Sequence, residues 1–206
     1  MVSASEALAR LKEGNKRFVS GVRGLEAMAT QTRIPEFAEG QAPFAVILGC
    51  SDSRVPVELV FDQGLGDLFV IRVAGNVVAP SLVGSVEFAA LHLGSRLVVV
   101  MGHTRCGAVG ATISQLQQPT DTHSRNLLSI VDRVRPAVES LLTTELADDP
   151  AKLAKEAVRA NVRMSANHLR HGSATLEKLI AEEGLVVVGA EYALETGEVD
   201  FFDGLP

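Results

Sequence analysis

The sequence predicts an α/β fold with a mostly parallel central sheet flanked by helices, an N-terminal helical arm and an antiparallel edge strand. Continuous apolar runs such as Phe44–Gly49 and Leu97–Met101 are typical of parallel strands that are buried on both faces. These runs alternate with segments of helical periodicity, and that alternation favours a parallel sheet with right-handed crossovers. A chain of 206 residues can bury the core of one such unit, so we expect residues 1–206 to form a single domain.

The N-terminal segment has helical spacing. Apolar residues at Ala7, Leu8, Leu11 and Phe18 predict an amphipathic helix over 3–19, capped by a serine at position 3 or 5. Residues 20–41 hold three glycines and a proline and have little of their own to bury. We therefore expect residues 1–40 to form an arm that wraps a partner subunit.

The remaining elements follow from the same patterns. Further strands are expected at Asp67–Arg72 and Leu185–Glu191, with an edge strand at Val199–Phe202. Helices are expected at Val57–Phe61, Ser81–Leu93, Gly107–Gln117, Asn126–Leu146, Ala151–His171 and Thr175–Glu183.

Composition excludes several classes of protein. A content of 47% hydrophobic and 21% charged residues indicates a globular chain and argues against disorder. A net charge of -6 argues against nucleic acid and anionic membranes as partners. No apolar stretch approaches the roughly 20 residues of a membrane span, and no secretory signal is visible. A cytoplasmic location, which keeps the two cysteines reduced, is the expectation.

Two of the predicted strands end in potential metal ligands. Cys50 follows the first apolar run, and His103 and Cys106 follow the run that ends at Met101. The carboxyl ends of parallel strands meet at one edge of a sheet, so these side chains can converge. Two thiolates and an imidazole suit zinc, and three ligands without a fourth leave an open, catalytic position. We expect Cys50, His103 and Cys106 to hold one Zn²⁺ per chain.

Asp52 and Arg54 lie beside the first ligand. Residues 50, 52 and 54 share one parity, so in extended backbone they face the same side. We expect Arg54 to pair with Asp52, keeping it ionised and turned away from the metal. The carboxylate is an acceptor only, so it can take a hydrogen bond from a zinc-bound hydroxide and orient it. Without Arg54, Asp52 could move in and close the fourth position.

The paired motif, Cys50-x-Asp52-x-Arg54 with His103-x-x-Cys106, resembles that of the β-class carbonic anhydrases. The similarity runs from about Leu11 through Gly66–Arg72 and Gly75-Asn76 to the final strands, and so covers nearly the whole chain. The resemblance implies reversible hydration of carbon dioxide to bicarbonate and a proton by a zinc-bound hydroxide. It also implies a homodimer or a dimer of dimers.

The resemblance further implies a substrate pocket. Gln41 matches a residue that hydrogen-bonds the substrate, Phe69 an apolar wall supplied across the dimer interface, and the Gly107 N–H a donor to bound substrate. Ile47 stands where a bicarbonate-regulated subgroup carries tryptophan, although Arg72 and Tyr192 are present. The chain thus resembles the subgroup without the non-catalytic bicarbonate pocket.

Two alternative functions stay open at this point. The same site could hydrolyse carbonyl sulfide or carbon disulfide, which are linear molecules like carbon dioxide. A non-catalytic zinc or thiol module would instead have a closed ligand set or a Cys50–Cys106 disulfide.

Overall fold

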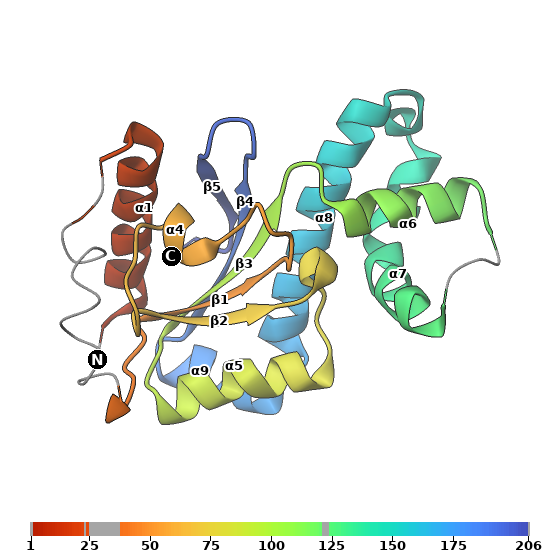
Figure 1. The fold of residues 1–206 in the computed structure, drawn as a ribbon. Coiled ribbons are helices and arrows are strands. Elements are labelled where there is room, and N and C mark those ends of the chain that lie inside the picture. Colours follow the sequence, from red (N-terminus) through yellow and green to blue (C-terminus); the bar gives the residue numbers. More distant parts are fainter. Residues whose placement is uncertain (1, 23, 25–37, 121–123, 206) are drawn as a thin grey trace.

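The computed structural model describes residues 2–22, 24, 38–120 and 124–205. Its centre is a five-stranded sheet in the order β2-β1-β3-β4-β5 (Figure 1). Strands β1 to β4 run parallel and β5 pairs antiparallel with β4, as the sequence predicted. Most of the segment between positions 20 and 41, which the predicted arm contains, lies outside the described residues.

The strands are β1 (Ala45–Gly49), β2 (Leu68–Arg72), β3 (Leu97–His103), β4 (Val186–Tyr192) and β5 (Val199–Asp203). The α-helices are α1 (Ala4–Ser20), α4 (Val57–Val60), α5 (Pro80–His92), α6 (Gly107–Gln117), α7 (Arg125–Glu139), α8 (Pro150–His171) and α9 (Ala174–Glu182). Three 3-10 turns are η1 (Ala74–Asn76), η2 (Leu141–Thr143) and η3 (Glu145–Asp148). In the part of the chain that is described, no helix combines the length and the apolar character that crossing a membrane requires.

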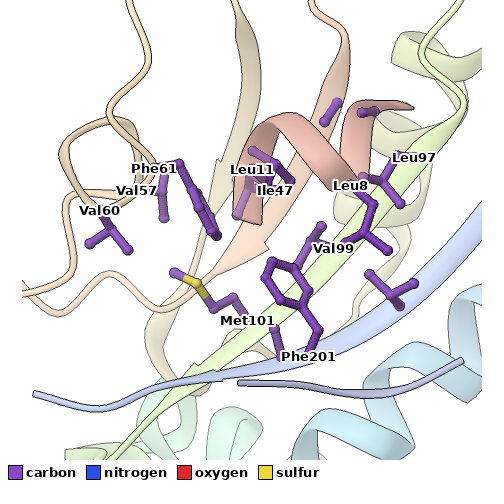
Figure 2. Packing of buried hydrophobic residues seen from close by; sticks show 14 of the residues in the cluster. Leu8, Leu11, Ile47, Val57, Val60, Phe61, Leu97, Val99, Met101 and Phe201 are labelled. Carbon is purple, nitrogen blue, oxygen red and sulfur yellow. The ribbon is translucent and has the colours of Figure 1, made fainter. Parts of the chain in front are cut away.

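Helix α1 packs against the sheet of its own chain (Figure 1). Its N-cap is Ser3, whose Oγ accepts a hydrogen bond from the backbone N–H of Glu6 at 3.2 Å. Its buried side includes Leu8 and Leu11, and Figure 2 shows them beside residues of β1 and β3. Burying each leucine stabilises this contact by roughly 1.5–3 kcal/mol. These contacts lie within one chain, so the expectation that residues 1–40 wrap a partner subunit stays a prediction.

The two faces of the sheet are covered by different helices. On one face, alternate strand residues such as Ile47, Val99 and Met101 pack with α1, α4 and Phe201 (Figure 2). On the other face, the intervening residues pack with α5, α8 and α9. Because β1 and β3 are buried on both faces, their sequences are continuous apolar runs without alternation.

Two predicted elements differ from the structure by more than one residue at an end. The helix expected over Asn126–Leu146 ends at Glu139 and is followed by η2 and η3. Just beyond that end, the hydroxyls of Thr143 and Thr144 donate to the carbonyls of Ser140 and Leu141 at 2.8 and 2.7 Å. These local bonds compete with the helical pattern, and Thr144 is extended. Strand β3 is also longer than expected.

Candidate metal centre

The three predicted ligands converge at the carboxyl edge of the sheet. Cys50 directly follows β1, His103 is the last residue of β3, and Cys106 is the N-cap of α6. Strands β1 and β3 are hydrogen-bonded neighbours, with Gly49 opposite Met101. All three side chains are buried, and their ligand atoms lie within 4.8 Å of one another. The fold therefore gathers two sulfurs and one imidazole where a single ion could contact all of them.

The imidazole of His103 is oriented by the backbone. Its Nδ1 lies 2.9 Å from the carbonyl oxygen of Thr104, so Nδ1 carries the proton and donates it. The other ring nitrogen, Nε2, is buried and has no hydrogen-bond partner among the described residues. A buried, unpaired nitrogen with a free lone pair beside two thiols fits a zinc ligand.

The two thiols influence each other strongly. The pKa of the Cys50 thiol is lowered, first because Cys106 donates a hydrogen bond to it and further by contacts with His103 and the Gly75 N–H. The same hydrogen bond raises the pKa of Cys106, and burial adds to this effect. Burial opposes protonation of His103, but its contacts with Cys50 and Asp52 outweigh burial and raise its pKa. The cluster thus holds negative charge that a divalent cation would neutralise.

Arg54 and Asp52 form a two-pronged ion pair. Arg54 Nε lies 2.9 Å from Asp52 Oδ1, and a terminal guanidinium nitrogen lies 2.8 Å from Oδ2. The backbone N–H of Arg54 also donates to Oδ1 at 3.0 Å. The pKa of Asp52 is held well below its usual range, chiefly by these hydrogen bonds from Arg54. Asp52 is therefore ionised throughout the neutral range.

The geometry behind this pair differs from the expected one. Residues 53 and 54 lie in a turn, which the Val55 N–H closes by donating to the Asp52 carbonyl at 3.0 Å. The turn, and not strand parity, brings Arg54 back onto Asp52. Asp52 Oδ2 lies 3.8 Å from His103 Nε2, so the carboxylate stands beside the ligand cluster.

The three predicted substrate residues occupy separate places in the chain. Gly107 is the first residue of α6 and is exposed, directly after Cys106. Gln41 is exposed, just before β1. Phe69 pairs in register with Val46, and its ring centroid lies 6.2 Å from that of Phe88 on α5. Within one chain, therefore, only Gly107 adjoins the metal ligands in sequence.

Several contacts around the cluster were not anticipated. Arg72 donates to the carbonyl oxygens of Cys50 and Asp52 at 3.0 and 2.6 Å, which fixes the turn after β1. Glu195 accepts a hydrogen bond from the Thr104 hydroxyl at 2.8 Å and forms an ion pair with Arg105 at 2.7 Å. These two partners lie in sequence between the ligands His103 and Cys106. No local sequence signal marks Glu195, because it lies 91 positions from Thr104.

An apolar cluster surrounds the ligands. Cys50 and Cys106 pack with Val77, Val109 and residues of α7 and α8. A mostly parallel sheet with two thiols and an imidazole at its carboxyl edge, enclosed by apolar side chains, defines an α/β protein with a zinc site of the catalytic kind.

Comparison with known proteins agrees with that class. The family model for carbonic anhydrase matches residues 45–199. Carbonic anhydrase 2 of Mycobacterium tuberculosis is 39% identical over 187 residues, which cover 91% of this chain and 87% of that protein. A β-carbonic anhydrase of Aspergillus fumigatus superimposes with a TM-score of 0.76 at 27% identity, covering 98% of this chain and 91% of that one.

A further solved structure, from work on two tetrameric β-carbonic anhydrases of Sordaria macrospora, gives a TM-score of 0.74 at 26% identity. It covers 87% of this chain and 90% of that one. The chain belongs to the β-class carbonic anhydrases. It catalyses the hydration of carbon dioxide, and its zinc site is formed by Cys50, His103 and Cys106.

Proposed function

We propose that each chain holds one zinc ion and that Asp52 and Arg54 orient the nucleophile for carbon dioxide hydration. The observation that carries this proposal is the two-pronged Arg54–Asp52 pair, whose Oδ2 stands 3.8 Å from His103 Nε2. Arg54 uses both prongs on the carboxylate, so Asp52 is held ionised and kept from becoming a fourth ligand.

The chain's own residues have distinct tasks. When bound, zinc acts as a Lewis acid that lowers the pKa of water towards neutrality. Asp52 accepts a hydrogen bond from the nucleophile and thereby aims its lone pair at the substrate carbon. Val77 and Val109 keep bulk water from the ligands, which strengthens the electrostatic interactions inside the site.

The proposed substrate contacts are Gln41, Phe69 and the Gly107 N–H. Phe69 lies opposite Val46, and Val46 comes four residues before Cys50. At the rise of a β-strand, this separates Phe69 from the metal ligands of its own chain by about 13 Å along the strand direction. Its proposed role as an apolar wall for bound carbon dioxide therefore requires a second subunit. This separation supports a homodimer or a dimer of dimers, and the related Sordaria macrospora enzymes are described as tetrameric.

We further propose that the enzyme belongs to the subgroup without a non-catalytic bicarbonate pocket. Ile47 is fully buried in the core where the regulated subgroup carries tryptophan. Arg72 is engaged with two backbone carbonyls, and Tyr192 is buried in the core cluster. The tryptophan of the bicarbonate pocket is therefore missing here, and the arginine is already bound to backbone carbonyls.

Two further proposals concern the domain organisation and the cellular location of the protein. The five strands form one sheet, and separate apolar clusters cover its two faces and surround the ligands at its carboxyl edge, which supports a single domain over residues 1–206 with an N-terminal arm. The two free thiols of the site need a reducing compartment, so we propose a cytoplasmic location.

One experiment tests the central proposal. The purified protein is analysed for zinc, and carbon dioxide hydration is followed by stopped flow with a pH indicator. We expect about one zinc per chain and activity that chelation removes and zinc restores. A protein without zinc, or one with zinc but inactive, would contradict the assignment.

A further inference from the structure

Helix α8 carries two polar side chains in its buried stripe. Most of the buried positions on this helix are apolar, but Asn161 and Ser165 lie among them and are 0% and 3% exposed. Burying an amide among valines and alanines costs free energy unless its hydrogen bonds are made. These two residues therefore need a reason beyond packing.

Both side chains bind the turn η1. Asn161 Nδ2 donates to the carbonyl oxygen of Gly75 at 2.8 Å, and Ser165 Oγ donates to the carbonyl oxygen of Asn76 at 3.0 Å. Asn161 Oδ1 is buried and has no hydrogen-bond partner among the described residues. An acceptor left unpaired in the core costs free energy, because it has given up its hydrogen bonds to water. The position of the side chain therefore satisfies the Nδ2 donor, which binds Gly75, and leaves the Oδ1 acceptor unsatisfied.

The residue that Asn161 binds is itself bound to a metal ligand. The backbone N–H of Gly75 donates to Cys50 Sγ, with a nitrogen–sulfur distance of 3.4 Å. Gly75 has a φ of +72°, and a Cβ there would lie 2.9 Å from the Cβ of Ala108 on α6. Only glycine fits this position, so the backbone can approach the sulfur while α6 and α8 confine it from two sides.

We propose that Asn161 is a positioning residue for the metal centre, which holds Gly75 so that its N–H points at the Cys50 sulfur. The inference rests on the proposed function, because it takes Cys50 as a zinc ligand. An N–H donor withdraws electron density from a thiolate and fixes the direction of its lone pairs. Loss of such a hydrogen-bond partner of a ligand typically costs roughly 10–100-fold in metal affinity or activity.

The test compares Asn161→Leu with Ser165→Ala. Leucine keeps the size and branching of asparagine but cannot donate, so only the bond to Gly75 is lost. Ser165→Ala removes a neighbouring bond from the same helix to the same turn, but to the next residue. It therefore serves as a matched control for loss of stability without loss of the Gly75 contact.

Two readouts separate positioning from folding. The first is the rate at which a chelator removes zinc from the folded protein; we expect Asn161→Leu to release zinc roughly 10–100-fold faster than wild type. The second is the sulfur-to-metal charge-transfer band of the cobalt-substituted protein, which reports electron density on the thiolates. We expect this band to shift in Asn161→Leu and to stay in place in Ser165→Ala.

Wild-type zinc release and an unshifted cobalt band in Asn161→Leu, even with lowered thermal stability, would leave Asn161 a purely structural residue. Equal effects in both variants would mean the same. A wild-type protein without zinc would instead refute the proposed function.

A measurement on the wild-type protein covers the case in which Asn161→Leu does not fold. In protein loaded with an NMR-active cadmium isotope, the amide proton of Gly75 should show scalar coupling to the metal through the Cys50 sulfur. Absence of that coupling would mean that the Gly75 N–H does not bind the Cys50 sulfur, and the proposed role of Asn161 would then be refuted.

Discussion

Replacing Arg54 by alanine tests the orienting role of Asp52 most directly. Asp52 receives three hydrogen bonds from Arg54, at 2.9 and 2.8 Å from the guanidinium and 3.0 Å from the backbone N–H. Alanine keeps only the backbone bond, so two of the three are lost and the carboxylate can rotate. Its Oδ2 already lies 3.8 Å from His103 Nε2, so a small rotation brings it into the position of a fourth ligand.

The size of the effect follows from these contacts. Substitution of residues that hold metal-site groups typically lowers metal affinity or activity roughly 10–100-fold. Because Arg54→Ala removes both guanidinium hydrogen bonds, we expect it to lower kcat/KM by about 100-fold. The mechanism is reorientation and not protonation. Without Arg54 the pKa of Asp52 rises only towards its ordinary value near 4, so the carboxylate remains ionised at pH 7.

Stopped-flow hydration at pH 7 to 8, with zinc content measured on the same sample, checks this expectation. Arg54→Lys is the control, because it keeps the positive charge but loses the planar fork, and we expect its activity to lie between those of wild type and Arg54→Ala. Full zinc occupancy with wild-type kcat/KM in Arg54→Ala would refute the orienting role.

Three further predictions concern other parts of the molecule. Cys106→Ser should lose both zinc and activity, measured by metal analysis and hydration assay; a fully active variant removes Cys106 from the ligand set. Gly102→Ala places a Cβ 2.7 Å from Val162 Cγ2 and should lower the free energy of unfolding in urea by about 1–3 kcal/mol. An unchanged urea midpoint would mean that α8 can move away from the new methyl group without cost. Asn15→Ala breaks three hydrogen bonds that tie α1 to α4 and to the β4–β5 hairpin, and should lower the melting temperature by roughly 5–15 °C; a shift near zero would mean that α1 is not held there.

The strand-end ligands were predictable because their signal is local. Each ligand group directly follows or ends an apolar strand, and parallel strands deliver their carboxyl ends to one edge. The pairing of Arg54 with Asp52 was also predicted, but from strand parity. The turn closed by Val55 is the actual cause, since short-range turn chemistry overrides alternation once a strand has ended.

The failure at Asn126–Leu146 has a similar origin. Apolar spacing continues past Glu139, but the threonines that follow offer the backbone competing hydrogen bonds. Periodicity measures which face is apolar and is blind to such competition. Helix α8 shows the converse case: its buried stripe was readable, whereas the two polar residues inside it had no visible partner in the sequence.

By itself, the sequence determined the alternating architecture, the strands buried on both faces and the identity of the metal ligands, because each depends on residue type and short spacing. Tertiary structure alone decided which groups support those ligands. Asn161 and Gly75 are 86 positions apart, and Glu195 and Thr104 are 91 apart. Such pairs meet only after the sheet and its crossover helices have formed, and no local pattern records that meeting.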